Sequence, residues 1–81
     1  MVEKTYLIEW LLEALKSLGG RGSIVDICEY VWKKHENELR DSEDLFYTWQ
    51  YDIRWAATEL RKRGKIKHVN LSPKGIWELS S

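Results

Sequence analysis

The C-terminal third of the chain constrains the fold most, because a helical pattern there changes abruptly into an extended one. Residues 48–63 carry apolar side chains at helical spacing, and Gly64 follows where a helix would end. Beyond it, residues 65–69 and 76–79 are typical of two short antiparallel strands, joined by a Pro-Lys-Gly turn at 70–75. The sequence therefore predicts a helix followed by a β-hairpin.

Two further helices are predicted before this one. Apolar residues recur every three or four positions over residues 4–18, and Gly19 suits the position after a helix end. A second pattern over 24–35 begins after Ser23, a favourable N-cap. Residues 36–47 are acidic and lack clear periodicity, so a connector of about a dozen residues is expected before the third helix. The third helix is expected to bury Trp49, Ile53, Ala56, Ala57 and Leu60.

The predicted order is helix, short extended segment, helix, helix and two strands, in a single domain spanning residues 1–81. This is the α+β order of a winged helix-turn-helix domain, whose third helix enters the major groove of DNA and whose hairpin forms a wing. Cys28 is the only cysteine, so an intrachain disulfide is excluded and a reducing compartment is expected. The chain has no apolar run long enough for a membrane span, so a cytoplasmic location is expected, with nucleoid association if it binds DNA.

A net charge of zero conceals a strong asymmetry along the chain. Residues 54–81 contain seven Lys and Arg against two acidic residues, a net charge of +5. Residues 1–53 contain six Lys and Arg against eleven acidic residues, a net charge of −5. Such an asymmetry is typical of a protein with a polyanion-binding surface. The few side-chain amides, beside abundant Lys and Glu, favour a thermophilic or archaeal source.

Two motifs in the C-terminal part form a recognisable pattern, an Ile-Arg-Trp-Ala helix and a Ser-Pro-Lys-Gly-Ile-Trp turn and strand. This pattern resembles the N-terminal winged-helix domain of Mrr-type restriction proteins, and the resemblance implies DNA recognition. The matching residues are Ile53, Arg54, Trp55, Ala56, Leu60, Arg61, Lys62, Gly64, Ser72, Pro73, Lys74, Gly75 and Trp77. The 81 residues leave no room for the nuclease domain that usually accompanies it, so nuclease activity is not expected from them.

Helical spacing places the polar and basic side chains of the third helix opposite its buried face. Arg54 is suited to bind guanine and Gln50 to bind adenine, whereas lysines of the wing would contact phosphates. Trp55 either packs against Trp77 at the junction of helix and wing or stacks on a sugar or base, and the resemblance favours the structural role. The residues predicted to contact double-stranded DNA are Gln50, Tyr51, Arg54, Thr58, Arg61, Lys62, Arg63, Lys65, Lys67 and Lys74.

Two alternatives stay open for this basic face. The acidic connector would repel phosphate, so either its carboxylates point away from the duplex or the wing and the C-terminal half of the third helix make the contact. The cations could also be ordinary solvated charge, in which case the domain would be a protein–protein interaction module.

The apolar stripe of the first helix is wider than one core-facing side needs. The extra positions are Leu7, Trp10 and Ala14, which either a C-terminal strand covers or a homodimer seam buries. The soft metal ligands Cys28, His35 and His68 have no metal-site spacing, so no metal or other cofactor is expected. No nucleophile–base pair can be assembled from the sequence, so the chain is not expected to be an enzyme.

Overall fold

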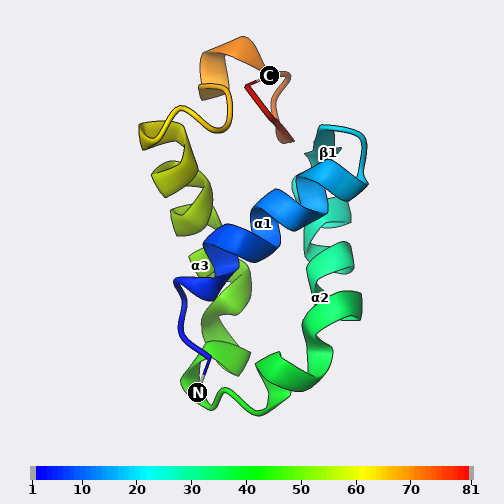
Figure 1. Ribbon diagram of the computed structural model, residues 1–81, viewed down its shortest axis with the longest axis vertical. Helices are drawn as coiled ribbons and strands as arrows, with labels where there is room; N and C mark the ends of the chain where they lie inside the picture. The colour runs from blue at the N-terminus through cyan, green and yellow to red at the C-terminus, as the bar shows by residue number, and fades with distance from the viewer. Residues whose placement is uncertain (1, 81) are drawn as a thin grey trace.

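The computed structural model describes residues 2–80, which form three helices and a two-stranded antiparallel sheet in an α+β arrangement (Figure 1). The helices are α1 (Tyr6–Ser17), α2 (Ile24–Arg40) and α3 (Asp44–Lys62). The strands are β1 (Arg21–Ser23) and β2 (Ile76–Glu78), and a short 3₁₀ helix, η1 (Val69–Leu71), lies between α3 and β2.

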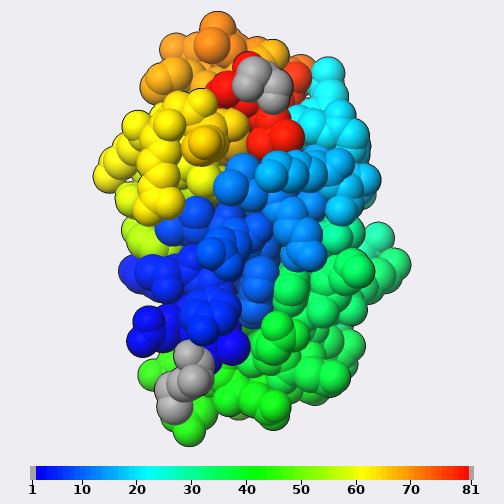
Figure 2. Space-filling view, viewed as in Figure 1, coloured from blue at the N-terminus to red at the C-terminus, as the bar shows by residue number. Residues whose placement is uncertain are grey.

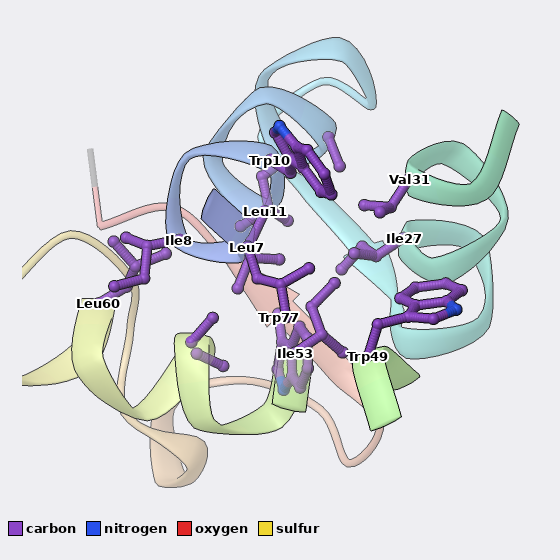
Figure 3. Close-up of a cluster of buried hydrophobic side chains, with 14 of the residues drawn as sticks. Leu7, Ile8, Trp10, Leu11, Ile27, Val31, Trp49, Ile53, Leu60 and Trp77 are labelled. Atoms are coloured by element: carbon purple, nitrogen blue, oxygen red, sulfur yellow. The ribbon is translucent and has the colours of Figure 1, made fainter. Parts of the chain in front are cut away.

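The core is built around α1, which crosses over α2 and α3 (Figure 1). Leu7 and Leu11 of α1 have no exposed surface, and they lie among Ile27 and Val31 of α2 and Ile53 of α3 (Figure 3). Full burial of a leucine or isoleucine side chain contributes about 1.5–3 kcal/mol. The predicted buried face of the third helix is confirmed, because all five of its predicted residues are buried.

The end of α3 also follows its sequence prediction. Gly64 adopts a φ of 74°, which only glycine reaches without strain. The amide of Lys65 then donates to the carbonyl of Leu60 at 2.8 Å, which satisfies one of the free carbonyls at the helix end. The chain therefore leaves α3 sharply and turns back toward α1.

The sheet differs from the predicted hairpin, because β2 pairs with β1. Glu78 lies opposite Arg21 in this antiparallel pair. The segment 65–69, predicted to be a strand, contributes an isolated bridge between Ile66 and Leu79 and then enters η1. Pro73 has no N–H to donate, and the surrounding turn residues direct the chain away from the sheet, so a long ladder cannot form on this side.

The predicted long connector between the second and third helices is wrong. α2 continues to Arg40 and α3 begins at Asp44, so that only Asp41–Glu43 separate them. A break lies inside α2 instead, at His35, whose φ of −126° and ψ of 22° are not helical. The break rotates the buried face of the helix, which explains the missing periodicity, and Leu39 beyond it returns fully to the core.

His35 also attaches this break to α1. Its ring stacks on Trp10 with a centroid distance of 4.0 Å and an angle of 8° between the planes. Its Nε2 lies 2.7 Å from Oε1 of Glu13, and its Nδ1 lies 3.2 Å from Oε2 of Glu38. The C-terminal half of α2 is therefore held against α1 by stacking and by two polar contacts.

The alternative of a homodimer seam on α1 is not supported by the burial of its residues. Leu7 and Ala14 have no exposed surface, and Trp10 is covered in part by the His35 ring. These three side chains are buried within the chain, because α2 and α3 together cover a wider part of the surface of α1 than one neighbouring helix could. They are not available for contact with a second copy.

Replacement of Ile53 by alanine tests the central position of this core. We expect Ile53→Ala to lower the free energy of unfolding by about 2–5 kcal/mol, because it leaves a cavity between α3 and α1. Val25→Ala is the matched control, since Val25 is 75% exposed and its loss should change stability by less than about 0.5 kcal/mol. Urea denaturation followed by tryptophan fluorescence measures both, and equal effects would contradict this description of the core.

Candidate nucleic-acid interface

The outer face of α3 presents most of the predicted helix contacts to solvent. Gln50, Tyr51, Arg54 and Thr58 are exposed and follow one another at intervals of one to four residues, on the side of α3 away from α1. Tyr47 extends this face by one turn and is 84% exposed. The sequence analysis missed Tyr47 because the residue lay in the segment assigned to the connector. We call these five residues the α3 face.

Three of the predicted DNA-binding cations have contacts within the chain. Nε of Arg61 donates to the carbonyl of Lys67 at 3.4 Å. Nζ of Lys62 lies 3.3 Å from Oε2 of Glu59, and Nζ of Lys67 lies 3.6 Å from Oε2 of Glu78. Arg61 and Lys67 thus join α3 to the C-terminal segment, and two of the three charges are partly neutralised.

The remaining predicted cations are not all brought together. Arg63 and Lys65 line a hollow of about 320 Å³ with Lys16 of α1. At about 100° per residue, Arg63 projects about 180° around the axis of α3 from Arg54. Figure 2 shows the segment after α3 (yellow) beside α1 (blue) and the C-terminal residues (red). Lys74 is exposed in the turn before β2. The predicted set is therefore divided between two sides of the molecule.

The turn that carries Lys74 is anchored to the start of α2. The amide of Ile24 donates to the carbonyl of Gly75 at 3.1 Å, and both residues line a hollow of about 390 Å³ with Val69. Ser23 caps the same helix, because its Oγ accepts from the amide of Asp26 at 3.0 Å. The segment 69–75 is thus held beside the N-terminus of α2 rather than extending freely.

Trp55 and Trp77 each have a cation as a neighbour. The ammonium of Lys4 lies 4.5 Å from the centroid of the Trp55 ring, and the guanidinium of Arg61 lies 6.0 Å from that of Trp77. Each tryptophan is therefore covered by a cation, a contact worth about 0.5–1 kcal/mol at an exposed site. Trp55 joins the N-terminal segment to α3, and Trp77 joins β2 to the end of α3.

The acidic residues near the start of α3 gather on one side of the helix. Glu43, Asp44 and Asp52 line a hollow with Glu3 of the N-terminal segment. At 100° per residue, Asp52 projects about 200° around the helix axis from Arg54. Asp52 consequently lies outside the α3 face, whereas Asp44, seven residues before Tyr51, lies at its N-terminal end.

A groove with aromatic walls runs between α2 and α3, next to the α3 face. Its volume is about 430 Å³, and Gln50 and Cys28 lie among the residues that line it. The rings of Trp32 and Trp49 are nearly parallel, with an interplanar angle of 9° and a centroid distance of 6.2 Å. The other lining residues are Val25, Glu29 and Phe46. We call this feature the α2–α3 groove. The sequence analysis missed it because no single helix carries its pattern.

Cys28 and Arg54 connect the groove to the α3 face electrostatically. Burial raises the pKa of the Cys28 thiol, and the nearby charge of Arg54 opposes that rise in part. Arg54 follows Gln50, which lines the groove, by four residues and therefore lies on the same face of α3. The raised pKa lowers the thiolate fraction of Cys28 further and slows its reaction with electrophiles.

A comparison of the chain with protein-family models, with curated proteins and with solved structures finds no match. Within residues 2–80, none of the helices has the length and apolarity that crossing a membrane requires.

Glu78 is the acidic residue of the two-stranded sheet, and two cations lie near its carboxylate. Its pKa lies below its usual value of 4.5, first because of the Ser72 hydroxyl and then because of Lys67 and Arg21. Oε2 of Glu78 lies 3.6 Å from Nζ of Lys67 and 3.9 Å from Nη1 of Arg21. A lowered folded-state pKa means that Glu78 stabilises the fold at neutral pH, and that this stabilisation is lost as the pH falls through the folded-state value.

Replacement of Glu78 by glutamine tests this linkage. We expect Glu78→Gln to be less stable than the wild type at neutral pH, and to lose less stability on acidification, because the titrating group is gone. Urea midpoints measured from neutral to strongly acidic pH report both effects. Glu29→Gln is the control, since an exposed ion pair such as Glu29–Lys33 contributes little. If the urea midpoints of the wild type and Glu78→Gln fell equally on acidification, the linkage would be refuted.

Proposed function

We propose that this domain binds double-stranded DNA through the α3 face, with the segment 69–75 as a second contact. The observation that carries the proposal is the composition of that face, where Gln50 and Arg54 stand exposed with Thr58 and no carboxylate interrupts them. Asp52 projects to the other side, and Glu59 is occupied by Lys62. Such a face is complementary to a major groove with acidic phosphates along its edges.

The chemistry of the α3 face is suited to reading base edges. An α-helix fits the major groove of B-form DNA, where arginine pairs with guanine and glutamine with adenine through two hydrogen bonds each. Arg54 and Gln50 occupy adjacent turns of α3. Lys74 would contact a phosphate from the turn before β2, and such a contact positions the protein without reading sequence.

The order of elements supports a winged helix-turn-helix architecture for this function. Three residues separate α2 from α3, which agrees with the usual three- or four-residue turn of the helix-turn-helix motif. The segment 69–75 would then be the wing, and it is held by the contact between Ile24 and Gly75. The resemblance of the Ile-Arg-Trp-Ala and Gly-Ile-Trp motifs to Mrr-type N-terminal domains favours the same proposal.

We propose a small transcription regulator or chromatin-associated factor as the class of protein that fits this surface. A protein–protein interaction module is the second candidate, and the aromatic α2–α3 groove is the observation that favours it. The two differ in their response to salt, because only binding to phosphates releases condensed counterions.

Removal of single cations tests the DNA proposal. We expect Arg54→Ala to weaken duplex binding by about 1–3 kcal/mol. We expect Lys74→Ala to reduce the slope of the logarithm of the binding constant against the logarithm of the salt concentration by about 0.9 in magnitude, for one lost phosphate contact. Lys34→Ala is the matched control, because Lys34 is an exposed cation of α2 outside the proposed interface. Fluorescence anisotropy of a labelled duplex at several salt concentrations measures all three. An absence of saturable binding at low salt would reject DNA as the partner.

A further inference from the structure

Aromatic side chains gather at one place on the surface, beside the proposed DNA-binding face. Tyr47 and Tyr51 project from α3 and are 84% and 77% exposed. The α2–α3 groove adds Trp32 and Phe46, whose ring centroids lie 6.3 Å apart. Arg40 covers part of these two rings, with its guanidinium 5.1 Å from the Trp32 centroid and 5.9 Å from the Phe46 centroid, but both rings also line the groove. Exposed aromatic surface of this kind, with Tyr47 and Tyr51 beside it, is typical of a site where a partner binds.

An intact duplex makes little use of such a surface. Stacked bases hide their ring faces and offer only their edges to a protein in the major groove. Bases that are unstacked, by contrast, pack their ring faces on aromatic side chains, at about 1–3 kcal/mol per base. Exposed rings next to a DNA-reading face therefore fit a base that has left the stack.

The polar groups at the mouth of the groove fit a nucleotide. The Gln50 amide, which lines the groove, offers both a donor and an acceptor for the edge of a base. Arg54 follows Gln50 by four residues, so it lies one turn further along the same face of α3, where it can attract a phosphate beside the groove. The one acidic lining residue, Glu29, is paired with Lys33 at 3.6 Å, so its charge is partly offset.

We propose that the α2–α3 groove holds one unstacked base of the bound DNA, with its ring face on Trp32, the tilted Phe46 ring beside it and its edge at Gln50. In this complex Arg54 contacts the phosphate of the same nucleotide, whereas on a fully paired duplex Gln50 and Arg54 read base edges. The proposal rests on the proposed function and narrows its substrate to DNA that contains an unpaired or easily extruded base. Extrusion from an intact duplex costs a few kcal/mol, so DNA with an unpaired base is the preferred ligand.

The first experiment compares two DNAs that differ in one nucleotide. One is a fully paired duplex, and the other is the same duplex with a single unpaired nucleotide at its centre. We expect the second to bind the full chain at least about tenfold tighter by fluorescence anisotropy, because the cost of unstacking is already met. Equal affinities for the two DNAs would overturn the proposal.

Cys28 provides a direct report on the groove, because it is the only cysteine in the chain and lines the groove wall. Its rate of alkylation by N-ethylmaleimide at mildly alkaline pH is measured with no DNA, with the paired duplex and with the unpaired-nucleotide duplex. We expect the unpaired-nucleotide duplex to slow alkylation by several fold more than the paired duplex at equal saturation. Equal rates with both DNAs would place the base elsewhere.

A groove-blocking variant separates the groove from the rest of the interface. Val25 lines the groove but is 75% exposed, so Val25→Trp can cover the groove without disturbing the core. We expect it to abolish the preference for the unpaired nucleotide while leaving affinity for the paired duplex nearly unchanged. Asn37→Trp, at an exposed position of α2 outside the groove lining, is the matched control and should retain the preference.

The outcomes distinguish this proposal from the proposed function. If neither DNA binds at low salt, the proposed function fails and this proposal fails with it. If the paired duplex binds with the expected salt dependence but shows no preference and no selective Cys28 protection, DNA binding stands and the groove proposal is refuted. That second result would leave the groove to a different occupant, such as an apolar side chain of a protein partner.

Discussion

The packing of α1 against both α2 and α3 is the constraint on which the rest of the structure depends. Leu11 of α1 and Ile53 of α3 have no exposed surface, and their burial fixes which side of α3 faces inward. The opposite side is then presented to solvent as the α3 face. The orientation of the proposed DNA-reading residues is thus a direct consequence of the hydrophobic core.

The break at His35 has the second largest effect on the surface. By rotating the last turns of α2, it returns Leu39 to the core and shortens the link to α3 to three residues. α3 consequently begins at Asp44, which places Tyr47 on the exposed face and Phe46 in the wall of the groove. A local change in backbone conformation thus exposes Tyr47 and places Phe46 in the wall of the α2–α3 groove.

The positive charge of the C-terminal part has two roles. Arg61 and Lys67 are held by a carbonyl and a carboxylate within the chain, where they join α3 to the segment before β2. Arg54 and Lys74 remain exposed and are the cations on which the proposed DNA contact depends. A lysine or arginine forms a contact within the chain when a carbonyl or carboxylate lies close to it. Which acceptors lie close depends on how segments distant in sequence pack together.

The sequence by itself determined the three helices, the buried face of α3 and the stop at Gly64, because helical periodicity and glycine at a positive φ are local properties. Only the tertiary structure decided the pairing of β2 with β1, the burial of Trp10 beneath His35 and the α2–α3 groove. Each of these joins residues far apart in the chain, and strand partners and helix–helix grooves leave no periodic signal in either segment alone. The sequence accordingly identified most of the exposed residues of α3 in the candidate interface. It did not show which of the predicted cations form contacts within the chain and which remain exposed.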